Sequence, residues 1–145
     1  MMDIPDCHLL SLEYFSEQTK YFHLCVKMNI LFEKLFDMNE WVLIYSDHLV
    51  LVFLRKDGNN SQLISRFAKD KSDGLQTIVI QAAAKAMKNP SNPHYLISLG
   101  KVFYKMNKID DAEKALSMAS KIEPANPLIN EYLHMINERK GKNQN

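Results

Sequence analysis

The hydrophobic residues in the second half of the chain recur with a helical period. Between residues 75 and 87 they occupy positions i, i+3, i+4, i+7, i+8, i+11 and i+12, namely Leu75, Ile78, Val79, Ala82, Ala83, Ala86 and Met87. This spacing predicts a helix from Leu75 to Lys88 with one apolar face, and its alanines allow a neighbouring helix to approach closely. The prolines of the following KNPSNP segment end the helix.

The first half of the chain changes period twice. From Leu9 to Met38 the apolar residues fall on more than one helical stripe, which predicts an irregular, largely buried helix. Two runs rich in β-branched and aromatic residues follow, WVLIY and LVLVFLR; joined by SDH, they predict a β-hairpin. Asp57-Gly58 then predicts a turn with a positive φ at the glycine, and the short helix after it takes Asn60 or Ser61 as its N-cap.

An Asn-Pro pair occurs twice, as Asn92-Pro93 and Asn126-Pro127, and the two pairs are 34 residues apart (126 − 92). Each pair predicts an N-cap followed by proline at the first helical position, where no N–H is needed. Between them the apolar pattern is interrupted at Asn107, which predicts two helices joined by a turn with a positive φ. A period of 34 residues with a helix-turn-helix inside it is that of the tetratricopeptide repeat.

The segment 93–126 resembles one tetratricopeptide repeat. Small residues stand where two helices would approach most closely, and larger apolar residues fill the space on either side. Leu96 stands where this family usually has tryptophan, and Asn107 where it often has glycine. A generic helical hairpin is the alternative interpretation. The positions that carry the resemblance are Leu96, Leu99, Gly100, Phe103, Ala112, Leu116, Ala119 and Pro124.

The resemblance implies a partner-binding groove lined by the first helix of the repeat. The matching positions are His94, Ile97, Lys101, Tyr104 and Lys105, a mixed surface that suits a protein or peptide with apolar and acidic character. If the groove is used, Lys101→Glu with Tyr104→Ala should abolish partner capture without altering stability. The alternative is that Ile97 and Tyr104 pack against the neighbouring helix or the first half of the chain.

The predicted fold is α+β and mostly helical. A helix and β-hairpin unit covers residues 1–72, and a helical repeat region covers residues 73–140, with one clear repeat at 93–126 and a polar-backed capping helix at 127–139. Residues 141–145 are expected to form a disordered tail. Within the repeat, Asp110 and Glu113 have the D-x-x-E spacing of a capping box at the start of the second helix.

Residues 40–70 are similar to a second kind of protein. In the soluble C-terminal region of bacterial multispanning membrane proteins of the glycosyltransferase-like class, a Trp-containing strand and a YxD turn lead into a second strand, a short helix and tetratricopeptide repeats. The shared residues are Trp41, Tyr45, Asp47, Phe53 and Arg55. This resemblance implies that the chain is an accessory region of a larger enzyme. The catalytic residues of that enzyme would lie in a membrane part that is absent from this sequence.

Charge and hydropathy narrow the choice of partners. The 18 basic and 17 acidic residues give a formal net charge of +1, which provides no field to attract nucleic acid or a membrane surface. The longest apolar run, from Trp41 to Leu54, is too short for a membrane helix, and the N-terminus lacks the basic region of a signal peptide. A cytoplasmic location is the default expectation, with a membrane-associated or extracytoplasmic one if the chain is the tail of a membrane protein.

Residues with catalytic or metal-binding chemistry are few and scattered. Cys7-His8 and His23-x-Cys25 are the nearest approach to metal-ligand pairs, and neither has a companion at zinc-site spacing. The four glycines form no phosphate-binding loop. A small enzyme would need His23, Asp47 and His48 to meet in one pocket. The sequence therefore favours a non-catalytic protein–protein interaction or scaffold module without metal or cofactor.

Overall fold

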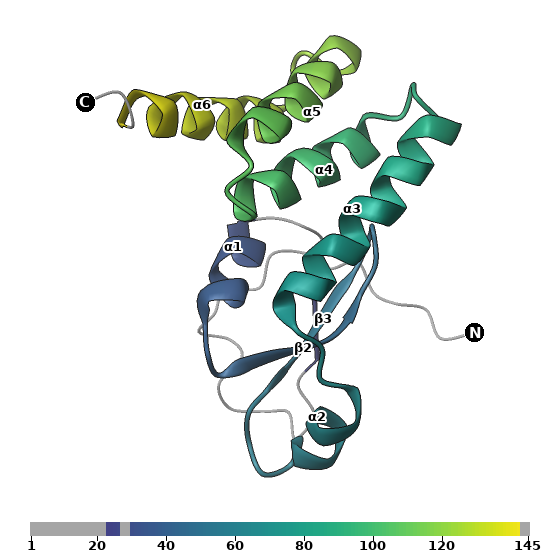
Figure 1. Ribbon diagram of the computed structural model, residues 1–145, viewed down its shortest axis with the longest axis vertical. Coiled ribbons are helices and arrows are strands. Elements are labelled where there is room, and N and C mark those ends of the chain that lie inside the picture. Colours follow the sequence, from purple (N-terminus) through teal and green to yellow (C-terminus); the bar gives the residue numbers. More distant parts are fainter. Residues whose placement is uncertain (1–22, 27–29, 143–145) are drawn as a thin grey trace.

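A computed structural model describes residues 23–26 and 30–142 of the chain, with side chains described from residue 33 onward. Within these residues the fold is α+β and mostly helical: a small antiparallel sheet precedes a row of helices (Figure 1). The elements are β1 (His23–Val26), α1 (Ile30–Asp37), β2 (Trp41–Ser46), β3 (Leu51–Arg55), α2 (Ser61–Phe67), α3 (Lys71–Lys88), α4 (Pro93–Lys105), α5 (Ile109–Ile122) and α6 (Pro127–Lys142).

The predicted β-hairpin is confirmed as β2 and β3, which pair antiparallel with Trp41 opposite Arg55 and Leu43 opposite Phe53. Its connection is an Asx-type turn, in which the Asp47 carboxylate accepts hydrogen bonds of 2.7 Å from the backbone N–H groups of Leu49 and Val50. The register shifts between Leu43 and Tyr45, which is the mark of a β-bulge. The turn chemistry of the SDH segment therefore fixes where the two strands begin and end.

The helix predicted from Leu9 to Met38 is confirmed over α1 and is wrong at residues 23–26. Residues 23–26 form strand β1, which pairs with β3 and makes a three-stranded sheet of order β1-β3-β2. The helix α1 begins only at Ile30. Residues 9–22 and 27–29 of the prediction lie outside the described residues. A run of four residues carries no helical or strand period of its own, so the unpaired edge of β3 decides its conformation.

The turn after β3 also differs from the prediction. None of the described glycines has a positive φ, so Gly58 does not supply the conformation expected of it. The turn is held by the Asp57 carboxylate, which accepts from the N–H groups of Asn59 and Asn60 at 3.1 Å. Asn60 is the N-cap residue of α2, but its side chain donates to the carbonyl of Arg55 at 3.0 Å instead of capping the helix.

The long helices begin and end close to their predicted positions. α3 begins at Lys71, four residues before the predicted start, because the Asp70 carboxylate caps its first N–H groups. Asn92 accepts from the N–H of His94 at 3.0 Å, and Asn126 accepts from the N–H of Leu128 at 3.0 Å. Both Asn-Pro pairs thus act as helix starts. Between α4 and α5, Asn107 has the predicted left-handed conformation, with φ at 60°.

The predictions for the start of α5 and for the end of α6 are wrong. The N-cap of α5 is Lys108 without a side-chain cap; Asp110 and Glu113 do not form a capping box but bind Lys140 of α6, at 2.9 Å and 2.7 Å. Both carboxylates are thus used across the α5–α6 pair and not at the start of α5. Helix α6 continues to Lys142, beyond the predicted end at residue 139, so Gly141 is helical; residues 143–145 lie outside the described part.

Two clusters of buried side chains form the core, and α3 and α4 contribute to both. In the first cluster, Leu35 and Phe53 pack with Ile78 of α3 and Val102 of α4. The second lies among α3, α4, α5 and α6 and includes Ala82, Leu96, Ile97, Leu99, Ala112, Ala115, Leu116, Ala119, Ile129, Tyr132 and Ile136. Helices α3 and α4 therefore pack against the sheet unit on one side and against α5 and α6 on the other. None of the helices in the described part is long and apolar enough to cross a bilayer.

Candidate interaction surfaces

The positions that suggested a repeat occupy the contact between α4 and α5. Gly100 lies against Leu116 so closely that a β-carbon at residue 100 would stand 2.4 Å from Leu116 Cγ. Around this contact, Leu96, Leu99, Ala112, Leu116 and Ala119 are buried and Phe103 is partly buried, whereas Pro124 is exposed after the end of α5. Gly100 and Ala112 thus stand where the two helices approach, and the large residues fill the space beside them.

The five residues predicted to line a groove are placed differently from one another. His94 is exposed at the N-terminus of α4. Ile97 is only 6% exposed and belongs to the core, and Lys101 is fully buried. Tyr104 packs edge-on against the Tyr132 ring, with ring centres 5.6 Å apart. Ile97, Lys101 and Tyr104 therefore face other parts of the same chain. Lys105 does so as well, through the contacts described next.

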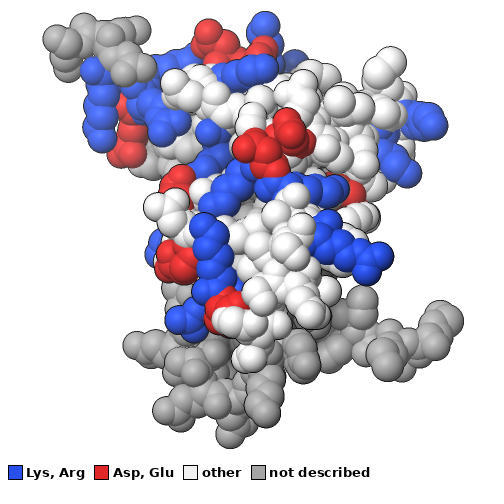
Figure 2. Space-filling view, turned by 60° about the horizontal axis from the view of Figure 1, so that its bottom comes forward, with Lys and Arg blue, Asp and Glu red and all other residues white. Residues whose placement is uncertain are grey.

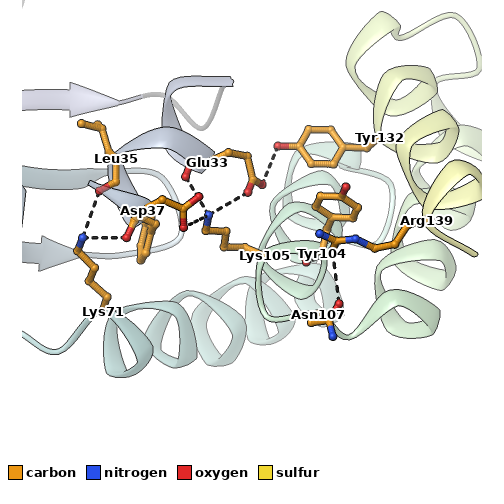
Figure 3. Close-up of polar contacts among 10 residues, drawn as sticks. Glu33, Leu35, Asp37, Lys71, Tyr104, Lys105, Asn107, Tyr132 and Arg139 are labelled. Carbon is orange, nitrogen blue, oxygen red and sulfur yellow. Dashed lines mark hydrogen bonds and ion pairs between the residues drawn. The ribbon is translucent and has the colours of Figure 1, made fainter. Parts of the chain in front are cut away.

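Lys105 binds the sheet unit through α1 (Figure 3). Its Nζ donates to the Glu33 carbonyl and to Asp37 Oδ1, at 2.8 Å each, and lies 3.4 Å from Glu33 Oε2. The hydroxyl of Tyr132 donates to the other carboxylate oxygen of Glu33 at 3.3 Å. Lys71 reaches the same helix from the opposite side and donates to the carbonyls of Leu35, Phe36 and Met38. The apolar and acidic segment that the groove was expected to accept is supplied here by α1 itself.

Burial and the nearby carboxylates have opposite effects on the pKa of Lys101. Its Nζ lies 5.7 Å from the centre of the Tyr132 ring. Removal from water lowers the pKa of Lys101 to about 8, although the carboxylates of Glu33 and Glu131 act to raise it. The pKa of the Tyr132 phenol is raised, mainly by burial and further by Glu33. A substitution of Lys101 by glutamate would bury an anion beside Glu33, and we therefore expect Lys101→Glu with Tyr104→Ala to lower stability as well as any partner binding.

Of the three side chains considered for catalysis, Asp47 and His48 make structural contacts. Burial would raise the pKa of Asp47, but the hydrogen bonds from Leu49, Val50 and the Tyr45 hydroxyl bring it below its usual value. The Nδ1 atom of His48 lies 3.3 Å from the side-chain oxygen of Gln81 on α3. The side chains of His23, Cys25, Cys7 and His8 lie outside the described residues. Among the described ones, no group of three or more His, Cys, Asp or Glu could hold a metal.

A different surface carries exposed apolar side chains in the helical region. On α3, Ile80 and Met87 are 62% and 84% exposed, and on α5, Met118 and Ile122 are 53% and 40% exposed. The sequence contains a signal for the second pair: Met118 and Ile122 are spaced i, i+4 and lie off the stripe of buried alanines on α5. The groove expected from the sequence lies on the first helix of the repeat and includes none of these four residues.

Comparisons with known proteins add no relative. No protein-family profile, no curated protein and no solved structure matches the chain.

Proposed function

We propose that this chain is a non-catalytic protein–protein interaction module built on a tetratricopeptide-type helical hairpin. The contact of Gly100 with Leu116, the left-handed turn at Asn107 and the two Asn-Pro helix starts 34 residues apart support the repeat assignment. Helical hairpins of this kind stack on their neighbours, and the stacks form extended surfaces that bind other proteins.

The observation that carries the interaction proposal is the exposure of four large apolar side chains on α3 and α5. A folded chain of this size has enough apolar residues to fill its core, and the two clusters already do so. Four large apolar side chains of the helical region nevertheless remain exposed, two on α3 and two on α5. Exposed apolar groups gathered in this way are typical of surfaces that bind other proteins.

The proposal is tested by purifying the endogenously tagged protein from its source cells after mild chemical cross-linking. An interaction module should elute in size-exclusion chromatography in a complex larger than the chain alone, with one or more proteins cross-linked to it in a fixed ratio. Elution as a free chain, with cross-links only within it, would contradict the proposal. The tag alone serves as the control for adventitious capture.

A second candidate function is an accessory region of a bacterial membrane protein of the glycosyltransferase-like class. The specific observation in its favour is the order of elements at residues 40–70, where β2, the Tyr45–Asp47 turn, β3 and α2 follow one another as that resemblance implies. An antibody raised against the chain discriminates the two. The accessory-region proposal requires a polypeptide much longer than 145 residues in the membrane fraction; a polypeptide of the length of this chain contradicts it.

A further inference from the structure

The later turns of α3 and α5 carry exposed basic side chains as well as apolar ones, whereas the exposed acidic residues Asp73, Asp110 and Asp111 stand in the first turns of the two helices. The C-terminal halves of the two helices carry three exposed lysines, Lys85 and Lys88 on α3 and Lys121 on α5, and a fourth, Lys114, is exposed in the first half of α5. No aspartate or glutamate occurs from residue 74 to residue 109, and none occurs between Glu113 and Glu123. Because Glu113 is bound to Lys140, it does not offset these lysines.

Of the four lysines, Lys114 acts on a charged group of the same chain: after Lys140, which is the main cause, it helps to lower the pKa of Asp110. None of the four forms an ion pair with a side chain in the described part of the chain, in contrast to Lys105 and Lys140, each of which binds two carboxylates. An exposed lysine costs little to keep in water, and it remains available to an anion that arrives from outside. The charge is therefore a property of the surface and not of an internal network.

The two helix halves lie at the same end of the helical region. α3 and α5 each run antiparallel to α4, which lies between them, so the C-terminal ends of both helices lie beside the N-terminal end of α4 (Figure 1). Toward the right edge of Figure 2, the side on which the α3–α4 turn lies, the visible charged side chains are basic. We name the surface of Ile80, Met87, Lys88, Lys114, Met118, Lys121 and Ile122 the α3–α5 face.

We propose that the α3–α5 face is a docking surface for an acidic amphipathic helix of another protein, an inference that rests on the proposed interaction function. The exposed methionines and isoleucines would contact the apolar side of that helix, and the lysines would face its carboxylates. Methionine adapts its shape to different apolar partners and is common on surfaces that bind amphipathic helices. Opposite charge speeds encounter and selects against basic partners.

An anionic membrane is the main competing occupant of a basic and apolar surface. A membrane-surface helix places large apolar residues in one continuous stripe that enters the lipid. Here the apolar groups are divided between two helices with α4 between them, and half of them are methionine. This arrangement suits a helix lying across two ridges better than a flat lipid surface.

The test uses the full chain and two helical peptides of about four turns. Both carry leucine on one face; the opposite face is glutamate in one and glutamine in the other. By fluorescence anisotropy at low salt, the glutamate peptide should bind about tenfold more tightly than the glutamine peptide, and the difference should shrink as salt is added. Equal binding of the two peptides, or binding of neither, would overturn the proposal.

Substitutions on the α3–α5 face test whether the peptides bind there. Lys88→Glu with Lys121→Glu should remove the preference for the glutamate peptide, and Met87→Gln with Met118→Gln should weaken both peptides about tenfold. The matched control is Lys56→Glu with Lys142→Glu, which makes the same change of charge at exposed lysines on other parts of the chain. A control that weakens binding as much as the face variants do would show an effect of net charge alone and would overturn the proposal.

Two further measurements distinguish the competing occupants. Vesicles of roughly three parts phosphatidylcholine to one part phosphatidylserine should not retain the chain in a sedimentation assay. If the vesicles retain the chain and the glutamate peptide does not bind it, the surface binds membranes and the proposal is overturned. Sedimentation equilibrium should show a monomer, and self-association lost in Met87→Gln with Met118→Gln would identify a second copy. If the cross-linked complex from cells survives the lysine variants, the interaction function stands and this face is not its site.

Discussion

Gly100 and Leu116 are in direct contact across the α4–α5 pair. A β-carbon on Gly100 would stand 2.4 Å from Leu116 Cγ and 2.8 Å from Leu116 Cδ2. Leu116 is fully buried and cannot turn away into solvent. The distance between the two helices is therefore set by the absence of a side chain at residue 100.

Gly100→Leu should destabilise the fold by about 1–3 kcal/mol, because the added side chain must push the helices apart or displace Leu116. The loss should exceed the gain of up to about 1 kcal/mol that replacing glycine gives within a helix. Urea unfolding monitored by circular dichroism measures it. Gly141→Ala is the control, since nothing lies within 4 Å of the β-carbon added there. An unchanged midpoint for Gly100→Leu would count against the close helix pairing.

This part of the fold could be predicted because it is local. The helices α4 and α5 are joined by a turn of a few residues, so the helical period and the small residues at Gly100 and Ala112 almost determine how they pair. The Asn-Pro helix starts act within one turn of the chain and were equally readable. Strand β1 was missed for the opposite reason, since its partner β3 lies further along the chain and not beside it in sequence.

Asn107 lies in the left-handed region with φ at 60°, which costs other L-residues more than it costs asparagine or glycine. We expect Asn107→Gly to raise the free energy of unfolding by a few tenths to about 1 kcal/mol, and Asn107→Ala to lower it by about 1 kcal/mol. Both variants lose the 3.5 Å contact from Arg139, so the difference between them reports the backbone alone. Paired urea unfolding curves measure it, and a more stable alanine variant would contradict the assigned turn.

The interior position of the predicted groove residues could not be read from the sequence. Lys101 and Lys105 have the spacing of a solvated helix face, and lysine is seldom fully buried without a partner. Their environment is created by α1, whose Asp37 is 68 residues before Lys105. A pairing over such a distance depends on how the sheet unit packs on α4, which no local pattern encodes.

The stability of the fold should depend on pH through Lys101. Its pKa is about 8 when folded against 10.5 ordinarily, so the unfolded chain binds the proton more tightly. Below about pH 8 both states are protonated and the folded state bears the full cost of the buried charge. As the pH rises from about 7.5 to about 9.5, stability should increase by about 2 kcal/mol from this group.

Urea unfolding at these two pH values measures the effect, and Lys101→Met, which removes the titrating group, is the control. The increase should be present in the wild type and largely lost in the variant. The range ends below pH 10 because the pKa of Tyr132 is raised: the unfolded phenol then loses its proton first and stability falls again. A variant that keeps the whole increase would assign the pH dependence to other groups.

Lys71 closes the C-terminal end of α1 with three hydrogen bonds from one ammonium group. Its Nζ donates to the carbonyls of Phe36, Met38 and Leu35 at 2.8, 2.9 and 3.3 Å, which uses all three of its donors. The partial burial that lowers the pKa of Lys71 also shields these carbonyls from water. The contact thus replaces a C-cap residue for α1 and attaches it to the first turn of α3.

Lys71→Met keeps the length of the side chain and removes the donors, so the three carbonyls lose their partner in a half-buried site. We expect a loss of about 1–3 kcal/mol in the free energy of unfolding, together with faster hydrogen exchange at the last amides of α1. Lys34→Met is the matched control, because Lys34 lies in the same helix with its side chain exposed. Equal destabilisation by the two variants would mean that Lys71 contributes only its charge, whereas a loss confined to Lys71→Met identifies the cap as what holds α1 against α3.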